Sequence, residues 1–230
     1  MSALKLGYWK ARGFTHPIRQ LLHITKLNFE NITWDTREEL QAQKEAVFFN
    51  GDKVHPFPNC PFLIDGDFVL TESSAIPLYI CHKANRPDLL GKNLVDQSRV
   101  RQIEGVAFDL LQTIGKHVFD PEKEKKIQEA AKEGGPCRQQ AGKLSEFLAE
   151  KDFLVGYLTY ADLLVVHYLL VTRNFCLSLG IEDPYKEFGN LDGLCRRIGA
   201  LPELEGFAYN YPYVLDWVYP WFKDHPLEEE

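Results

Sequence analysis

The sequence lacks the features that define several classes of protein. Its five cysteines are dispersed, odd in number and form no Cys-x-x-Cys pair. This pattern is typical of reduced intracellular thiols rather than of a disulfide framework or a zinc site. We therefore expect no bound metal and a cytoplasmic location.

Long apolar runs and dense basic runs are also absent from the sequence. The longest apolar stretch, 161–171, contains Asp162 and His167 and is too short to span a bilayer. The N-terminal residues lack the long apolar core of a signal peptide. A net charge of −7, from 33 acidic and 26 basic residues, argues against non-specific nucleic-acid binding. We expect neither a membrane nor a nucleic acid among the partners.

The stretch from residue 58 to residue 76 predicts strand, tight turn, strand and helix. Pro61 begins an apolar run, and proline suits the first residue of a strand because it cannot donate to the ladder. Asp65-Gly66 separates this run from a second one, which is the strongest short signal for a hairpin. Residues 71–74 are helix-capping types ahead of apolar residues at helical spacing, so we expect a helix beginning near Ser73.

The same stretch suits the binding of a small polar molecule. The expected helix start near Ser73 offers unpaired N–H groups and a positive dipole end, which attract a carboxylate. A cis Cys60–Pro61 bond would present the Cys60 backbone to a peptide-like ligand. On the residues alone, an ordinary trans proline at a strand edge remains the alternative.

The chain divides into two parts with different patterns. Residues 1–84 predict a small α/β domain that resembles a thioredoxin-like fold, in which the first two strands are parallel. Residues 85–92 form the expected linker, and 93–230 predict an all-helical bundle. Besides the hairpin, the expected strands are 4–9 and 29–34, and a loop is expected at 48–58. A capping box at Thr159-Tyr160-Ala161-Asp162 precedes an expected buried central helix. The other expected helices include 18–24, 38–47, 103–118, 128–148 (interrupted at Gly134-Gly135-Pro136), 191–198 and 202–209.

Four segments carry a resemblance to a known family. They are Gly7-Tyr8-Trp9 with residues 12–22, FPNCPFLIDG at 57–66, Thr71-Glu72-Ser73, and LTYADLL at 158–164. Together, and in this order, they resemble a cytosolic glutathione transferase, most closely one of the mu class. The resemblance implies a glutathione-binding domain at 1–84, a helical domain that contributes the electrophile pocket, and a cis bond at Pro61.

The resemblance implies that the Tyr8 hydroxyl hydrogen-bonds the glutathione sulfur. A thiol with a pKa of ~8.5 is mostly protonated at neutral pH, and the thiolate is the nucleophile. A donor to the sulfur favours the anion and lowers the thiol pKa. Without the resemblance, a tyrosine on a half-buried strand is the simpler interpretation of Tyr8.

The family also implies roles at the γ-glutamyl end of glutathione and at a subunit interface. Glu72 would meet the ammonium group, and Ser73 with its helix N-terminus would meet the carboxylate; plain helix capping is the alternative. The family forms symmetric homodimers, in which Asp109 would reach the amino group of the ligand bound by the partner subunit. Phe57 would insert into the neighbouring subunit. Further implied residues are Trp9 beside the sulfur (or a core aromatic), Asn59 and the Cys60 backbone at the middle of the tripeptide, and an electrophile pocket lined by Trp9, Phe14, Phe119 and Tyr209 or Tyr211.

The sequence departs from the family pattern at several of these positions. Glutamine is usual where Glu72 stands, leucine is usual where Cys60 stands, and Phe119 replaces an aromatic hydroxyl. The Trp and Lys that hold the glycine carboxylate in the mu class have no clear match, so Lys53 and Lys44 are alternatives for this role.

The resemblance implies an enzyme that conjugates the thiolate of glutathione to hydrophobic electrophiles. Glutathione would be a co-substrate, and no cofactor is expected. A non-catalytic binding or structural protein on the same fold and a glutathione-dependent isomerase are the alternatives. The sequence does not identify the electrophile.

Overall fold

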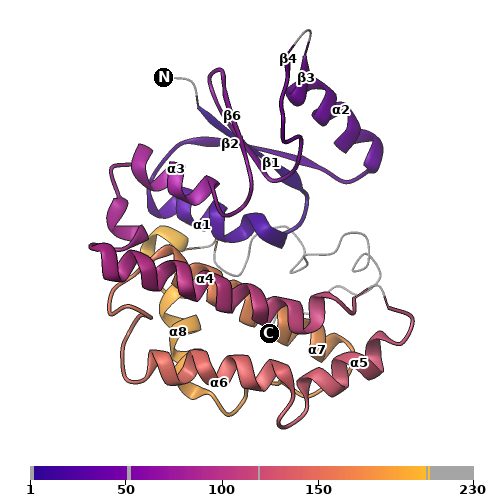
Figure 1. Ribbon diagram of the computed structural model, residues 1–230, viewed down its shortest axis with the longest axis vertical. Helices are drawn as coiled ribbons and strands as arrows, with labels where there is room; N and C mark the ends of the chain where they lie inside the picture. Colours follow the sequence, from indigo (N-terminus) through magenta and orange to yellow (C-terminus); the bar gives the residue numbers. More distant parts are fainter. Residues whose placement is uncertain (1–2, 51–52, 119, 206, 208–230) are drawn as a thin grey trace. The chain divides into compact units, whose positions relative to one another are not determined.

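The computed structural model describes residues 3–50, 53–118, 120–205 and 207 (Figure 1). The described chain divides into two compact units, one ending at Arg86 and the other beginning at Pro87. The first unit contains β1 (Leu4–Trp9), a 3-10 turn η1 (Gly13–Thr15), α1 (His16–Ile24), β2 (Phe29–Trp34), α2 (Arg37–Phe48), β3 (Phe49–Asn50), β4 (Lys53–Val54), β5 (Phe62–Asp65), β6 (Phe68–Thr71) and α3 (Ile76–Lys83).

The first unit is built on a four-stranded mixed sheet. The strand order is β2-β1-β5-β6; β1 and β2 are parallel, whereas β5 and β6 are antiparallel to their neighbours. Asp65 pairs with Phe68, so Gly66 and Asp67 form the turn between β5 and β6, and Gly66 has φ +60°, a conformation that suits glycine. The thioredoxin-like arrangement predicted from the sequence is therefore confirmed.

Helices cover both faces of this sheet (Figure 1). On one face, the buried rings of Trp34, Phe62 and Phe48, the last residue of α2, form one core cluster. The Phe62 ring lies so close to β1 that a Cβ on Gly7 would be 2.1 Å from it, so this position requires glycine. Side chains alternate along a strand, and Leu4, Leu6 and Tyr8 therefore point to the other face, where α1 and α3 pack together.

The loop predicted for residues 48–58 contains a short hairpin that the sequence analysis missed. β3 and β4 pair antiparallel through Phe49 with Val54 and Asn50 with Lys53. Two-residue strands carry no alternation by which they are recognised in a sequence.

The second unit is helical, as predicted. The helix expected from residue 103 begins earlier, because the Asn93 side chain accepts from the Asp96 N–H at 3.0 Å and caps it. The interruption predicted at residues 134–136 separates two helices, and the predicted 202–209 helix is described only as a 3-10 turn, its residues 206, 208 and 209 being outside the described residues. The elements are η2 (Pro87–Leu90), α4 (Leu94–Gly115), α5 (Lys123–Ala131), α6 (Pro136–Leu148), α7 (Tyr160–Ser178), α8 (Gly189–Gly199) and η3 (Pro202–Leu204).

The buried helix α7 begins at the predicted capping box. The fully buried Asp162 carboxylate accepts from the N–H groups of Leu154 and Thr159, both at 2.8 Å, and from the Thr159 hydroxyl at 2.9 Å. Burial raises the pKa of Asp162 to about 6, against the effect of these hydrogen bonds. The predicted N-terminus and the predicted burial of α7 are both confirmed.

Candidate functional site

Tyr8 lies near the carboxyl end of β1, with its side chain 5% exposed. Its hydroxyl oxygen accepts a hydrogen bond from the Phe14 N–H at 3.4 Å. A Cβ placed on Gly13 would stand 2.6 Å from the same oxygen, so the backbone of Gly13 and Phe14 borders the phenol closely. Gly13 also has φ +38°, a conformation that suits glycine.

Trp9 follows Tyr8 on the strand and points to the opposite face of the sheet. Its ring packs edge-on against Trp34 at a centroid distance of 6.1 Å, beside the core cluster of Trp34, Phe48 and Phe62. This is the packing of a core aromatic, the alternative that the sequence left open. A role for Trp9 beside a sulfur atom stays a prediction.

The segment before β5 has the cis Cys60–Pro61 bond that the resemblance implied. The exposed Asn59 side chain accepts from the Cys60 N–H at 2.9 Å. Burial raises the pKa of the Cys60 thiol, whereas the positive charge of Lys44 on α2 acts to lower it. Lys44 is therefore within electrostatic range of this segment. It is one of the two lysines that the sequence offered for the glycine carboxylate.

Glu72 and Ser73 lie in a turn between β6 and α3, and the predicted start of α3 near Ser73 is wrong. The helix begins at Ile76 without a side-chain cap. Glu72 adopts φ +76°, and its carbonyl oxygen accepts from the N–H groups of Ala75 and Ile76 at 3.0 and 3.1 Å. The turn thus uses a backbone carbonyl where the sequence suggested side-chain caps. A non-glycine residue at positive φ is costly and is often found at binding sites.

The backbone N–H groups of Ser73 and Ser74 in this turn are candidates for binding an anion. Among the described residues, no partner is found for the N–H groups of Ser73 and Ser74. Unpaired amides that precede a helix bind carboxylates well.

The other predicted residues are distributed over both units. Phe57 is 67% exposed, and its N–H donates to the His55 ring at 3.1 Å. Asp109 is an exposed residue of α4 in the second unit. Lys53 belongs to β4, where its side chain is not among the described ones; Phe119, Tyr209 and Tyr211 lie outside the described residues.

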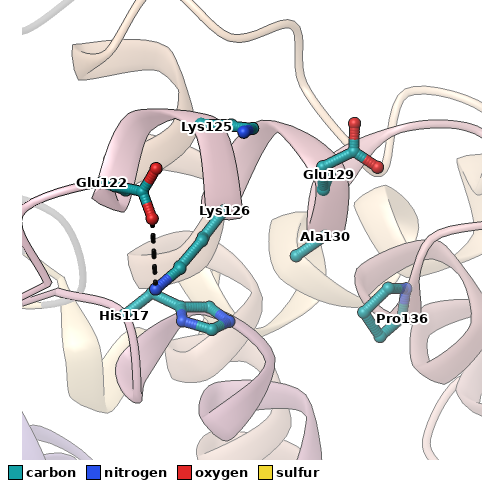
Figure 2. A pocket seen from close by; sticks show the side chains of 7 residues that line it. All are labelled: His117, Glu122, Lys125, Lys126, Glu129, Ala130 and Pro136. Carbon is teal, nitrogen blue, oxygen red and sulfur yellow. Dashed lines mark ion pairs between the residues drawn. The ribbon is translucent and has the colours of Figure 1, made fainter.

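A hollow of about 310 Å³ in the second unit contains none of the predicted site residues (Figure 2). Figure 2 shows side chains of both charges around it, with Lys126 directed to Glu122 at 3.9 Å. Within the described ranges, no three or more His, Cys, Asp or Glu side chains are grouped to hold a metal ion. The lining is His117, Glu122, Lys125, Lys126, Glu129, Ala130 and Pro136.

Sequence reasoning missed a buried arginine that contacts the segment after Tyr8. Arg19 on α1 is 0% exposed and donates to the carbonyl oxygen of Ala11 at 2.7 Å. The only signal in the sequence was an arginine at the border of the apolar face of a predicted helix.

Comparison with known proteins gives the same result for both units. Residues 4–82 match the family model of the glutathione S-transferase N-terminal domain, and residues 108–209 match that of the C-terminal domain. The chain is 33% identical to glutathione S-transferase Mu 2 of Mus musculus over 89% of each protein, and 31% identical to glutathione S-transferase 2 of Gallus gallus over 88% of each. A solved structure of the glutathione S-transferase Blo t 8 is 28% identical, has a TM-score of 0.78 and is covered over 97% of its chain, against 94% of this one.

Proposed function

The chain belongs to the glutathione S-transferase family, and we propose that Tyr8 is the residue through which it activates glutathione. Its activity is that of a transferase which conjugates glutathione. Members of this family bind glutathione and electrophilic substrates and are typically dimers. No observation on the described residues favours the alternatives of a non-catalytic binding protein or an isomerase.

The observation that carries the role of Tyr8 is its hydrogen bond from the Phe14 N–H at 3.4 Å. A phenol whose oxygen accepts a hydrogen bond becomes a stronger donor through its own O–H. Donation from Tyr8 to the sulfur favours the thiolate over the thiol and lowers the thiol pKa. The thiolate then attacks an electrophilic carbon of the acceptor, and the proton of the thiol leaves to solvent.

For the γ-glutamyl end of glutathione, we propose the turn before α3. The amides of Ser73 and Ser74 suit the carboxylate, and the exposed Glu72 side chain suits the ammonium group. In a dimer, Asp109 of the partner subunit would add a second carboxylate for this ammonium group.

For the rest of the tripeptide, we propose Asn59 and the backbone of Cys60. The Cys60 N–H already donates to the Asn59 side chain, so the ligand pairs with the Cys60 carbonyl oxygen or displaces that side chain. For the glycine carboxylate we propose Lys44, because its charge acts on Cys60, with Lys53 as the alternative. Phe14, Phe119 and Tyr209 remain our proposed residues for the electrophile.

A symmetric homodimer is the proposed assembly. Two observations support it: Phe57 in the first unit is 67% exposed, and Leu94, Val95 and Phe108 on α4 of the second unit are exposed. Large apolar side chains that stay exposed in the single chain are candidates for contacts with a second copy. We further propose that residues 1–84 bind glutathione, that 85–92 link the parts and that 93–230 supply the acceptor pocket. The division of the described chain at residue 86 supports this assignment.

A cytoplasmic location is proposed from the cysteines. None of the five described cysteines is in a disulfide bond, which suits a reducing compartment. Separately, none of the helices in the described part of the chain has the length and apolarity needed to cross a membrane.

Replacing Tyr8 by phenylalanine tests the proposed function. We expect the pKa of the bound glutathione thiol to rise by about one to two units, since a charge-assisted hydrogen bond contributes roughly 1.5–3 kcal/mol. The thiolate absorbance of the enzyme–glutathione complex, titrated against pH, measures this shift directly. Conjugation of a generic aryl halide at neutral pH should fall by roughly tenfold or more. Unchanged thiol pKa and unchanged conjugation would refute the role of Tyr8.

A further inference from the structure

Arg19 joins four elements of the first unit through one buried guanidinium group. Its Nη1 donates to the carbonyl oxygen of Ala11 at 2.7 Å, and its Nη2 lies 3.5 Å from that of Trp9. Its Nε donates to the Asn31 side chain at 3.2 Å. The end of β1, the loop after it, α1 and β2 therefore meet at Arg19.

The loop that Arg19 holds continues directly to the backbone that borders Tyr8. After Ala11, the Arg12 carbonyl oxygen accepts from the N–H groups of Thr15 and His16 at 3.1 and 2.8 Å. These bonds close the η1 turn, in which the Phe14 N–H is directed to the Tyr8 oxygen. Only Arg12 separates Ala11 from Gly13, so a displacement of Ala11 would be passed along the chain to Gly13 and Phe14.

A guanidinium group is required for this arrangement. Its planar fork donates in several directions at once, whereas a lysine ammonium group is a single point charge on a flexible stem. A lysine ammonium group at position 19 would donate to only one of the two carbonyl oxygens, those of Ala11 and Trp9. The other oxygen would lose the donor that arginine provides. The loop would then lose part of what fixes it on β1.

We propose that Arg19 is a positioning residue for the reaction: it fixes the loop whose Phe14 N–H engages Tyr8, and so sets the acidity of the bound glutathione thiol. This inference rests on the proposed role of Tyr8. Arg19 acts through the backbone of the loop. Its replacement is therefore expected to change the pKa of the bound thiol separately from any change in folding stability.

The test is Arg19→Lys, with the pKa of the enzyme-bound glutathione thiol as the readout. We expect a rise of about one unit, which at a pH below that pKa leaves roughly tenfold less thiolate. The KM for glutathione should change little, while the rate of conjugation falls with the thiolate fraction. An unchanged thiol pKa in a folded Arg19→Lys protein would overturn the inference.

A double-mutant cycle separates this inference from the proposed function. With Tyr8→Phe already present, Arg19→Lys should produce no further rise in the thiol pKa, because both changes act through one hydrogen bond. If Tyr8→Phe alone leaves the thiol pKa unchanged, the role of Tyr8 fails. If Tyr8→Phe raises it and Arg19→Lys does not, only the role of Arg19 fails.

Arg138→Lys is the matched control, because Arg138 in the second unit also donates to a backbone carbonyl, that of Ala131 at 3.1 Å. It should leave the thiol pKa unchanged; an equal rise in both variants would indicate general loosening and overturn the inference. If Arg19→Lys does not fold, Asn31→Ala removes the acceptor of the Arg19 Nε and leaves the guanidinium group in place. A smaller rise in the thiol pKa is then expected, and no rise would again overturn it.

Discussion

In each unit, one buried charged side chain anchors the chain ahead of a helix. Arg19 donates to carbonyl oxygens of the segment before α1, and Asp162 accepts from N–H groups of the segment before α7. The Arg19 segment leads to the backbone that borders the Tyr8 hydroxyl. The Asp162 contacts are confined to residues 154 and 159 of the helical unit. We propose that the same device serves chemistry in the first unit and stability in the second.

The largest effect is expected from Asp162→Ala, which tests the stability side of this comparison. It leaves the buried N–H groups of Leu154 and Thr159 without their acceptor, and each unsatisfied group costs roughly 1–3 kcal/mol. We expect the free energy of unfolding, measured with urea, to fall by about 3 kcal/mol or more. The pKa of bound glutathione thiol should not change in the fraction that folds. A changed thiol pKa would break the comparison.

The pH dependence of stability follows from the same carboxyl group. Because burial raises the pKa of Asp162 from 3.8 to about 6, the native state binds more protons than the unfolded state between these values. Its contribution is therefore fully present below pH 3.8 and is lost as the pH rises through 6. The linkage amounts to at most about 3 kcal/mol. The stability difference between the wild type and Asp162→Ala should narrow from pH 4 to pH 7; a widening would contradict the raised pKa.

The two anchors also differ in how far the sequence predicted them. Asp162 lies three residues after Thr159 in a capping box, a local pattern that is visible in the sequence. Arg19 binds carbonyl oxygens eight and ten residues away across a fold that must form first, and no local pattern marks such contacts. Local side-chain motifs were therefore predicted, and backbone-directed tertiary contacts were not.

The turn before α3 shows the same limit. Cap-type side chains between residues 71 and 74 suggested a helix start at Ser73, yet the Glu72 carbonyl oxygen and its positive φ organise the turn. A positive φ at glutamate cannot be anticipated from propensity, because tertiary structure imposes it. The existence of the β5–β6 hairpin, in contrast, was predicted from Asp65-Gly66, although Asp65 pairs with Phe68 as the last residue of β5 and the turn begins at Gly66.

Gly13→Ala sharpens the chemical side of the comparison, with a smaller expected effect. Its φ of +38° alone costs an alanine roughly 1–2 kcal/mol, and the new Cβ would stand 2.6 Å from the Tyr8 oxygen. We expect modest destabilisation together with a raised thiol pKa and slower conjugation. Gly66→Ala is the matched control, since Gly66 has φ +60° with nothing within 4 Å. It should lose similar stability and keep the thiol pKa; parallel loss of activity in both variants would show that strain alone is responsible.

The smallest effect is expected at Lys44 on α2, the residue proposed to bind the glycine carboxylate. Lys44 and Lys53 were alternatives in the sequence; the charge of Lys44 acts on Cys60, and the Lys53 side chain is not among the described ones. A half-exposed cation and a carboxylate contribute about 1 kcal/mol or less, so Lys44→Gln should raise the KM for glutathione by up to roughly fivefold without changing the thiol pKa. Lys53→Gln should leave both unchanged. The reverse result would assign the glycine carboxylate to β4, and would confine the site to strands and turns without α2.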